Sequence, residues 1–230
     1  MLYNYSLLDA DGVAAVVEAV PGCVAVRTGA WLACTNHFQS PLLRPLNRRA
    51  AHSQQRLPPL EAWAYDPRLT QPMETFVGHA EPELFTEKLN LKRPRLGGAN
   101  PMHQDYPYWV DVSDDATQIA TTIIFLDDST VDNGCLWVIP GSHQQGKWTT
   151  RDDGDEFAHN EVDEASYPDA TAVPVQLTKG STLSFGAFLV HKSAQNLSEE
   201  NRRTLLFSYQ PPGRRRQVDS VRNWIARTPG

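Results

Sequence analysis

The sequence predicts a mainly β fold, a sandwich or jelly roll with helices packed outside it. From Leu89 onward, short apolar or β-branched runs are separated by Gly, Pro, Asn or Asp residues, which is the pattern of strands joined by turns. Helical patterns belong to the first 90 residues. Many short strands with frequent turns are typical of two packed sheets, because each sheet must bury one face against another layer.

The expected strands share a β-branched or aromatic composition and have turn-forming residues at their ends. Around Leu89 and Leu91, apolar residues alternate with polar ones at the period of two that a half-buried strand shows. The segment at 119–126 is almost wholly apolar or β-branched. The remaining expected strands lie at 136–139, 173–177, 182–185 and 204–209.

Two helices are expected before the strands begin. The first is predicted at 13–20, where aspartates precede the segment and Pro21-Gly22 closes it. The second is predicted from residue 73 to about residue 88, after Pro72, with four core side chains: Phe76, Val77, Leu84 and Phe85. We expect a single domain, made of a variable N-terminal segment at 1–87, a jelly-roll core at 88–210 and a tail at 211–230.

Composition and charge exclude several function classes. The chain has 230 residues, 40% of them hydrophobic and 21% charged, which is ordinary for one large globular domain. Its net charge of −6 argues against nucleic acid as the main partner. No apolar run approaches the ~18 residues of a membrane span, and the N-terminus does not resemble a signal peptide. Three widely spaced cysteines, Cys23, Cys34 and Cys135, fit reduced thiols, so we expect a soluble cytoplasmic protein.

Two polar segments are expected at the surface. Residues 144–172 are acidic and poor in aliphatic side chains, which predicts a long loop after the strand at 136–139. Such a loop could be a lid over one end of the barrel or a passive insertion. The basic run Arg214-Arg215-Arg216 near the C-terminus is expected to form a solvated face.

The chemistry of the chain is expected to centre on His103 and Asp105. On a strand, residues i and i+2 point to the same face, so these two side chains can converge on one metal ion. A third ligand would come from another strand, and His191 follows an apolar run that would carry it into the interior. Two histidines and one carboxylate on one face of an octahedron are typical of non-haem Fe(II) oxygenases. The other histidines lie in a turn or in polar, Pro-rich surroundings: His37, His52, His79, His143 and His159.

Arg202 opens the strand expected at 204–209, eleven residues after His191. A guanidinium at the mouth of a β core is costly unless it meets a carboxylate, which it can hold with two hydrogen bonds. A dicarboxylic co-substrate would explain the arginine and the metal site together, if its keto-acid end bound the metal and its far carboxylate met Arg202. Arg203 is the rival, but strand alternation points it to the opposite face.

Three blocks around these residues resemble the phytanoyl-CoA dioxygenase family. The blocks are 102–109 (MHQDYPYW), 133–143 (NGCLWVIPGSH) and 191–198 (HKSAQNLS), and Arg202 follows them. Members of the family are Fe(II)- and 2-oxoglutarate-dependent oxygenases with a double-stranded β-helix, or jelly-roll, core, and they include ectoine hydroxylases. The resemblance covers roughly residues 88–210 and implies the same fold and activity for this chain.

Carried over by position, the resemblance implies that His103, Asp105 and His191 bind the iron. It also implies that Arg202 binds the distal carboxylate of 2-oxoglutarate. Further contacts to the co-substrate are implied for four residues: Asn90, Lys92, Trp109 and Ser193.

Three of these four contacts have a structural alternative. Trp109 could be a plain core residue, Lys92 could be a solvated lysine at a sheet edge, and Ser193 could merely close the turn after its strand.

The implied reaction is hydroxylation, or another oxidation, of an unactivated C–H bond in a small molecule. O₂ and 2-oxoglutarate would be consumed, and succinate and CO₂ would be released. Related halogenases replace the metal-binding carboxylate with Gly or Ala, whereas this chain keeps Asp105. Two other function classes stay open. One is a cupin-like metal-dependent isomerase or hydrolase, which has no need of a buried Arg202, and the other is a non-catalytic jelly roll that binds a small ligand.

Overall fold

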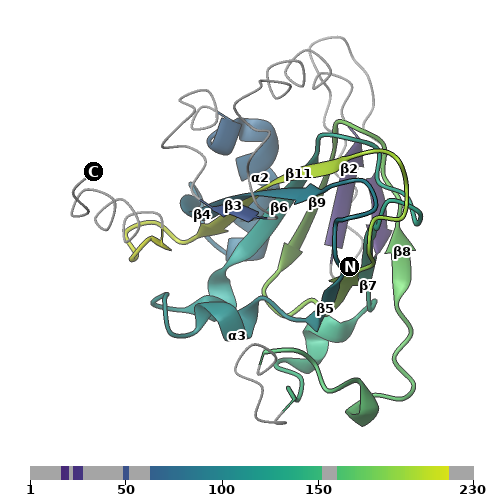
Figure 1. The fold of residues 1–230 in the computed structure, drawn as a ribbon. Helices are drawn as coiled ribbons and strands as arrows, with labels where there is room; N and C mark the ends of the chain where they lie inside the picture. Colours follow the sequence, from purple (N-terminus) through teal and green to yellow (C-terminus); the bar gives the residue numbers. More distant parts are fainter. Residues whose placement is uncertain (1–16, 21–22, 28–48, 52–62, 152–159, 218–230) are drawn as a thin grey trace, which may run out of the picture.

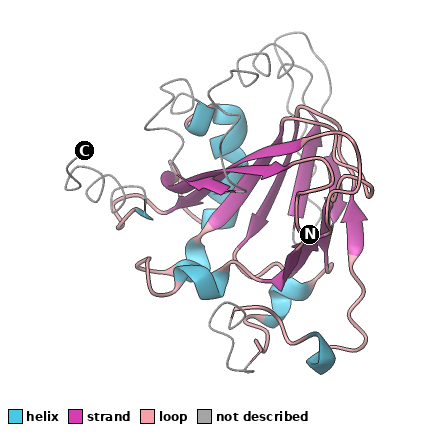
Figure 2. Ribbon diagram, viewed as in Figure 1, coloured by secondary structure: helices cyan, strands magenta, loops and turns pink. Residues whose placement is uncertain are grey.

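The computed structural model describes residues 17–20, 23–27, 49–51, 63–151 and 160–217, the first three segments by their backbone alone. Within this part of the chain, the strands form two antiparallel sheets packed face to face as a jelly roll (Figure 1, Figure 2). The mainly β fold predicted from the sequence is confirmed.

The larger sheet has seven strands in the order β1-β2-β9-β6-β11-β4-β3, so strands distant in sequence are neighbours. These strands are β1 (Val17–Val20), β2 (Cys23–Arg27), β3 (Arg49–Ala51), β4 (Glu83–Lys92), β6 (Ala120–Phe125), β9 (Ser181–Gly186) and β11 (Arg202–Gln210). The smaller sheet has four strands in the order β5-β10-β7-β8. They are β5 (Asn100–His103), β7 (Leu136–Val138), β8 (Val173–Val175) and β10 (His191–Ser193). The helical elements are α2 (Pro67–Val77), α3 (Tyr106–Trp109), η5 (Ala116–Gln118), η6 (Ser142–Gln145) and η7 (Glu164–Ser166).

Strand β6 lies at the centre of the fold, and all of its residues are buried because both of its faces are covered. Ala120 and Ile124 pack in the cluster beneath α2, whereas Ile123 and Phe125 face the smaller sheet. Val138 of β7 meets them there. Full burial of a side chain such as Phe125 is worth about 1.5–3 kcal/mol, so these two clusters hold the helix and the two sheets together as layers.

The second predicted helix is misplaced, because α2 begins before residue 73 and ends at Val77, and a strand occupies the second half of the segment 73–88. Asp66 caps the first turn of α2 by accepting a hydrogen bond from a backbone N–H at 2.9 Å. The helix ends where Gly78 takes φ of 71°, a left-handed conformation that favours glycine. Leu84 and Phe85 are core residues as predicted, but they lie on β4.

The first predicted helix is also wrong where the structure describes it. Residues 17–20 form β1, which pairs with β2 in a hairpin whose register runs from Val17 opposite Val26 to Val20 opposite Cys23. Strand β2 in turn pairs with β9, so the hairpin extends the larger sheet and gains its hydrogen bonds. A four-residue segment has too little intrinsic helical preference to resist this pairing. Residues 13–16 lie outside the described residues.

The expected strands from Leu89 onward are confirmed in type and place, with ends that differ by a few residues. The segment predicted as a long loop, 144–172, is described at 144–151 and 160–172, and both parts share a buried cluster with Met102 of β5 in the smaller sheet. Trp148 and Val162 are buried in one cluster, and the Trp148 ring stacks on Tyr167 with centroids 3.9 Å apart. The described parts of the segment 144–172 are therefore packed against the jelly roll.

No helix within the described residues has the length and apolar character needed to cross a bilayer. Of the cysteines, Cys135 is a free buried thiol, and burial raises its pKa. The backbone of Cys23 lies on β2, and Cys34 is outside the described residues.

Candidate metal centre

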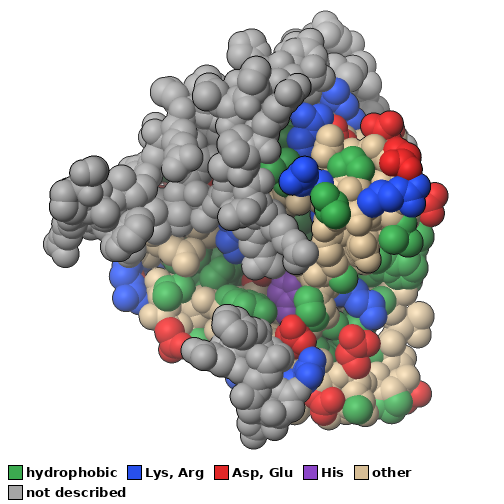
Figure 3. Space-filling model, viewed as in Figure 1, with side chains coloured by type: hydrophobic (Ala, Val, Ile, Leu, Met, Phe, Trp, Pro, Cys, Tyr) green, Lys and Arg blue, Asp and Glu red, His purple; other side chains and the backbone are tan. Residues whose placement is uncertain are grey.

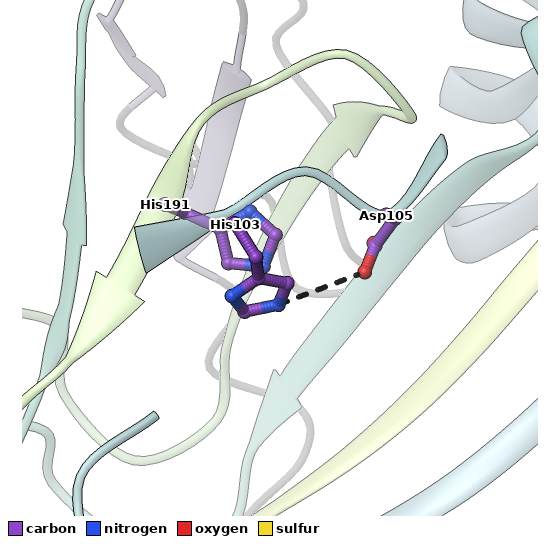
Figure 4. A group of neighbouring side chains, drawn as sticks. All are labelled: His103, Asp105 and His191. Carbon is purple, nitrogen blue, oxygen red and sulfur yellow. Dashed lines mark ion pairs between the residues drawn. The ribbon is translucent and has the colours of Figure 1, made fainter. Parts of the chain in front are cut away.

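Two histidines and one carboxylate come together inside the jelly roll (Figure 4). His103, Asp105 and His191 can each offer one ligand atom, and these atoms all lie within 4.8 Å of one another. Nε2 of His103 is 4.0 Å from Oδ1 of Asp105, and the two imidazole centroids are 4.2 Å apart. His191 is buried and the other two are half-buried. No other group of this kind occurs among the residues that the structure describes.

The smaller sheet places the two histidines. His103 ends β5, His191 begins β10, and the antiparallel register sets them directly opposite each other. Asp105 is not on a strand, because β5 ends at His103 and Asp105 has φ of −74° and ψ of −27° just before α3. The expectation that one strand would carry both His103 and Asp105 was therefore wrong. A turn, and not strand alternation, brings the carboxylate to the imidazoles.

The hydrogen bonds of the histidines determine which nitrogen faces the site. Nδ1 of His103 is 2.7 Å from the carbonyl oxygen of Pro101, and Nδ1 of His191 is 2.9 Å from that of Leu189. A carbonyl oxygen only accepts, so Nδ1 is the protonated nitrogen in each ring. Nε2 is then the nitrogen with a lone pair for a metal ion, which is the usual arrangement of metal-binding histidines.

Gln104, which sequence reasoning did not single out, holds this turn in place. Its buried amide nitrogen Nε2 donates to the carbonyl oxygens of Gly146 and Phe188 at 2.8 and 2.7 Å. Its Oε1 accepts from the backbone N–H of Trp148 at 2.8 Å. A buried amide with its partners in place specifies one geometry, because any shift would leave a polar group unpaired. Gln104 therefore connects the metal-binding turn to the chain around Gly146 and Trp148.

A cavity of about 270 Å³ opens beside the three side chains. In the space-filling view, histidine (purple) is visible in a recess between hydrophobic (green) and acidic (red) side chains (Figure 3). The apolar part of the wall comes from both sheets: Ile123, Leu136, Phe185 and Leu206. The cavity therefore offers a partly dry space next to the candidate ligands.

Arg202 enters this cavity from the first position of β11. It is 6% exposed, its Nε has no hydrogen-bond partner in the described part of the chain, and burial lowers its pKa from 12.5 to about 10. Arg203 lies on the opposite face, where the Asp127 carboxylate accepts hydrogen bonds from Nε and Nη2 at 2.8 and 2.6 Å. Those hydrogen bonds raise the pKa of Arg203. The expected alternation is observed, and of the two arginines Arg202 is the one that lines the cavity.

Three of the four further residues expected near the co-substrate lie in the cavity wall: Asn90, Trp109 and Ser193. Oδ1 of Asn90 is buried, and no residue that the structure describes forms a hydrogen bond with it. Trp109 also packs edge-on against Phe85, with ring centroids 5.9 Å apart, so it is a core residue and a wall residue at once.

Lys92 is the fourth, and it does not belong to the described lining of the cavity. Its ammonium group donates hydrogen bonds to the carbonyl oxygens of Gly98 and Ala194. The lysine is 6% exposed, so it is neither a solvated edge residue nor a wall residue. It ties the end of β4 to the chain that follows β10.

The cavity also contains side chains that sequence reasoning missed: Lys88, Tyr108, Glu161 and Gln217. The alternation along β4 could have indicated Lys88. Tyr108 lies within the block around the metal ligands, and its ring meets that of His103 edge-on with centroids 5.7 Å apart. Glu161 is placed beside His103 by an isolated β-bridge between the two residues, and no local sequence pattern predicts this bridge.

Gln217 lines the cavity because ion pairs hold the basic run before it, Arg214-Arg215-Arg216, in place. The solvated face expected at 214–216 is observed for Arg215, which is exposed, whereas Arg214 and Arg216 are half-buried, and each of the three arginines meets a carboxylate of another segment. The pairs are Arg214 with Asp115 at 3.6 Å, Arg215 with Asp114 at 3.7 Å and Arg216 with Glu83 at 3.3 Å.

Comparisons with known proteins agree with this geometry. A model of the phytanoyl-CoA dioxygenase family matches residues 32–204. A phytanoyl-CoA dioxygenase of Arabidopsis thaliana is 30% identical over 67% of this chain and 53% of its own length. An L-proline trans-4-hydroxylase of Streptomyces griseoviridis is 32% identical over 55% of this chain and 53% of its own length.

Among solved structures, the epimerase SnoN in complex with Fe³⁺, alpha ketoglutarate and nogalamycin RO has a similar fold. The TM-score is 0.70 at 22% identity, and the match covers 91% of this chain and 86% of that one. The chain spans about half the length of the curated relatives it matches. On the extent of the family match, the chain belongs to the phytanoyl-CoA dioxygenase family.

Proposed function

We propose that the chain is an Fe(II)- and 2-oxoglutarate-dependent dioxygenase that hydroxylates an unactivated C–H bond of a small molecule, releasing succinate and CO₂. The observation that carries the proposal is one shared cavity, lined by His103, Asp105, His191 and the buried Arg202. Membership of the family and the likeness to a proline hydroxylase support the same activity.

The side chains present fit the groups that this activity needs. Two imidazole nitrogens and one carboxylate leave the remaining positions of an octahedral ion open, as in non-haem iron oxygenases. At the other end, Arg202 is a buried cation whose Nε has no hydrogen-bond partner among the described residues. A guanidinium in that state suits a carboxylate, which it can hold with two charged hydrogen bonds.

In this proposal a bound iron would supply O₂ activation coupled to the oxidative decarboxylation of 2-oxoglutarate. The chain itself binds and orients. Arg202 would hold the distal carboxylate, and Asn90, Trp109 and Ser193 would line the co-substrate between that carboxylate and the metal. The apolar wall around Phe185 would exclude water, which strengthens the ion pair of Arg202. Lys92 would support the site by holding the backbone and would not touch the co-substrate.

The buried Arg202 counts against a cupin-like isomerase or hydrolase, because such a site needs no cation opposite the metal. The retained carboxylate of Asp105 counts against halogenation, since it occupies the position that a halide would take. The free buried thiol of Cys135 suits a reducing compartment, and we place the enzyme in the cytoplasm.

The test is a screen for succinate release with Fe(II), ascorbate and 2-oxoglutarate across small metabolites. We expect one Fe(II) per chain and turnover with a subset of the metabolites. His191→Ala should abolish both turnover and most of the metal affinity, measured by anaerobic titration. The control is His143→Ala, because His143 is a half-buried histidine that lies outside the group of His103, Asp105 and His191. Burial lowers the pKa of His143. Unchanged Fe(II) binding in His191→Ala would remove that ligand from the proposal.

A further inference from the structure

Gln217 lines the cavity, yet neither the metal nor the co-substrate accounts for it in the proposed function. It belongs to the chain that follows β11, residues 211–217, which we call the C-terminal segment. Gln217 is half-buried, and within the described part of the chain its side-chain amide has no hydrogen-bond partner. An uncharged group of this kind in the wall of a site fixes the orientation of a ligand, because it can both donate and accept.

The C-terminal segment is held at the end of the larger sheet that is remote from Arg202. Arg216 forms an ion pair with Glu83, the first residue of β4, at 3.3 Å. Arg202 is paired with Lys92 at the other end of the same strand. Strand β4 is 10 residues long, so its ends are about 30 Å apart at the usual rise per residue. Gln217, directly after Arg216, therefore enters the cavity from the end opposite the place proposed for the distal carboxylate.

Two further arginines attach the C-terminal segment to the loop that follows α3. Arg214 is 3.6 Å from the carboxylate of Asp115, and Arg215 is 3.7 Å from that of Asp114. The backbone N–H of Arg215 also donates to Oδ2 of Asp114 at 2.8 Å. A single exposed ion pair contributes little, but a network of pairs and hydrogen bonds on one short segment determines its position. Gln217 is thus presented to the cavity by an anchored segment.

The loop that receives these arginines is itself connected to the cavity wall. Nη2 of Arg215 donates to the carbonyl oxygen of Ser113 at 2.9 Å. The buried Ser113 in turn donates to the carbonyl oxygen of Trp109 from its backbone N–H and its hydroxyl, at 3.0 and 2.8 Å. Trp109 lines the cavity and ends α3, and Asp105 immediately precedes this helix. The C-terminal segment therefore shares its support with the part of the wall that carries the carboxylate ligand.

The substrate is the ligand left for Gln217. In the proposed function the co-substrate runs from the metal to Arg202, so it uses the end of the cavity where Arg202 lies. A substrate must place its C–H bond beside the metal without displacing the co-substrate, so it occupies the remaining part. Gln217 borders that part, because it enters from the opposite end.

We infer that Gln217 binds the primary substrate, through a neutral group that both donates and accepts hydrogen bonds, as a carboxamide does. The inference rests on the proposed function and names the substrate class of the same site. A carboxylate can only accept and an ammonium can only donate, so each would leave one half of the glutamine amide unpaired. The cavity volume of about 270 Å³ lies just below the usual range for small-molecule sites, about 300–1,000 Å³, which agrees with a small substrate.

The test uses the whole chain loaded with Mn(II) and 2-oxoglutarate, which assembles the site without turnover. The probes are short primary carboxamides and the methyl ketones of the same shape, which keep the carbonyl acceptor and lack the N–H donor. Carboxylates of the same length form a third set. Thermal stabilisation and calorimetry measure the binding of each probe.

The variants separate hydrogen bonding from shape. Gln217→Met keeps the length of the side chain and removes both hydrogen-bonding groups, and Gln217→Ala is a second neutral replacement if the methionine variant does not fold. Gln217→Glu keeps the shape and an acceptor for the N–H of a carboxamide. Gln145→Met is the matched control, because Gln145 is an exposed glutamine outside the described lining of the cavity.

We expect the unaltered protein to bind carboxamides about two- to tenfold more tightly than methyl ketones, as a single hydrogen bond provides. Gln217→Met should lose this preference and keep its affinity for 2-oxoglutarate, while Gln217→Glu and Gln145→Met should retain the preference. An unchanged preference in Gln217→Met, a preference of the unaltered protein for carboxylates, or no binding of any probe would overturn the inference. Weakened 2-oxoglutarate binding in Gln217→Met would assign the glutamine to the co-substrate and overturn it too. Failure of the unaltered protein to bind Mn(II) and 2-oxoglutarate would instead remove the proposed function, and the inference with it.

Discussion

Arg202 and Arg203 are neighbours in the chain, but strand alternation gives them opposite environments. Arg203 has the Asp127 carboxylate as its partner, whereas Arg202 is buried in the cavity with its Nε unpaired. A pKa of about 10 means that Arg202 still carries its charge at neutral pH, despite the cost of burial. A carboxylate that enters the cavity would relieve this cost, which is a physical reason for tight binding of a diacid.

Replacing Arg202 and Arg203 by glutamine, one at a time, separates their roles. Arg202→Gln should raise the KM for 2-oxoglutarate about tenfold or more, because hydrogen bonds to charged groups contribute about 1.5–3 kcal/mol. Arg203→Gln is the matched control, and it should lower the midpoint of chemical unfolding with little change in KM. Equal effects of the two variants on KM, or a larger one from Arg203→Gln, would reverse the assignment.

Gln104 gives a second prediction at the scale of single residues. Gln104→Leu should weaken Mn(II) binding about 10- to 100-fold, because residues that orient metal ligands contribute to affinity in this range. Calorimetric titration with Mn(II) measures this, with circular dichroism as a check on folding. The exposed Gln144 supplies the control variant Gln144→Leu, which should bind Mn(II) as before. Normal Mn(II) affinity in a folded Gln104→Leu protein would show that the turn does not depend on this side chain.

At the scale of elements, the segment 144–172 connects the barrel wall to the site. Its described parts are anchored by Trp148 and Val162, and Glu161 between them contributes to the cavity lining. A backbone N–H of Val162 also donates to the carbonyl oxygen of Met102, next to a candidate metal ligand, at 2.7 Å. The segment is therefore in a position to shape the cavity, as a lid or wall would.

We predict that shortening this segment uncouples the reaction. Because the segment brings Glu161 into the cavity lining, its shortening should let water reach the reacting site, so that 2-oxoglutarate is still consumed while the yield of oxidised substrate falls. The ratio of succinate to oxidised substrate measures the coupling. Glu161→Gln serves as the control that changes charge and leaves the length intact. Unchanged coupling and substrate KM in the deletion variant would show that the segment is a passive insertion.

At the scale of the whole molecule, α2 is attached to the larger sheet by apolar packing, and the chain just before α2 is attached to it by a buried hydrogen bond. The Tyr209 hydroxyl, on β11, donates to the carbonyl oxygen of Ala64 at 2.6 Å. Tyr209 is fully buried in the cluster beneath α2, and burial raises its pKa well above 10. This contact lies on the opposite face of the sheet from the cavity.

Tyr209→Phe should therefore destabilise the fold and leave the site intact. The change keeps the ring but leaves the buried carbonyl oxygen of Ala64 unpaired, which costs about 1–3 kcal/mol. Urea unfolding monitored by fluorescence measures the loss, and 2-oxoglutarate affinity in the presence of Mn(II) should stay as it is. A loss of that affinity without a loss of stability would mean that the two faces of the sheet are coupled.

The strands from Leu89 onward could be predicted because their composition and period of two are local properties of the chain. The two helices could not be predicted correctly from such signals. Residues 17–20 become a strand through pairing with β2, and β2 pairs in turn with β9, which is far away in sequence. Sequence reasoning extended the second helix across Gly78, although a left-handed glycine ends α2 there. Local preference is weak in short segments, so tertiary pairing decides them.

The sequence by itself determined the mainly β fold, the residue types of the metal cluster and the choice of Arg202 over Arg203, because each depends on residue identity and strand alternation. Tertiary structure alone decided the rest. The turn at Asp105, the place of Lys92 away from the cavity, and the arrival of Glu161 and Gln217 at the cavity all depend on contacts between distant segments. Such contacts arise from the register of whole sheets, and no local pattern in the chain encodes them.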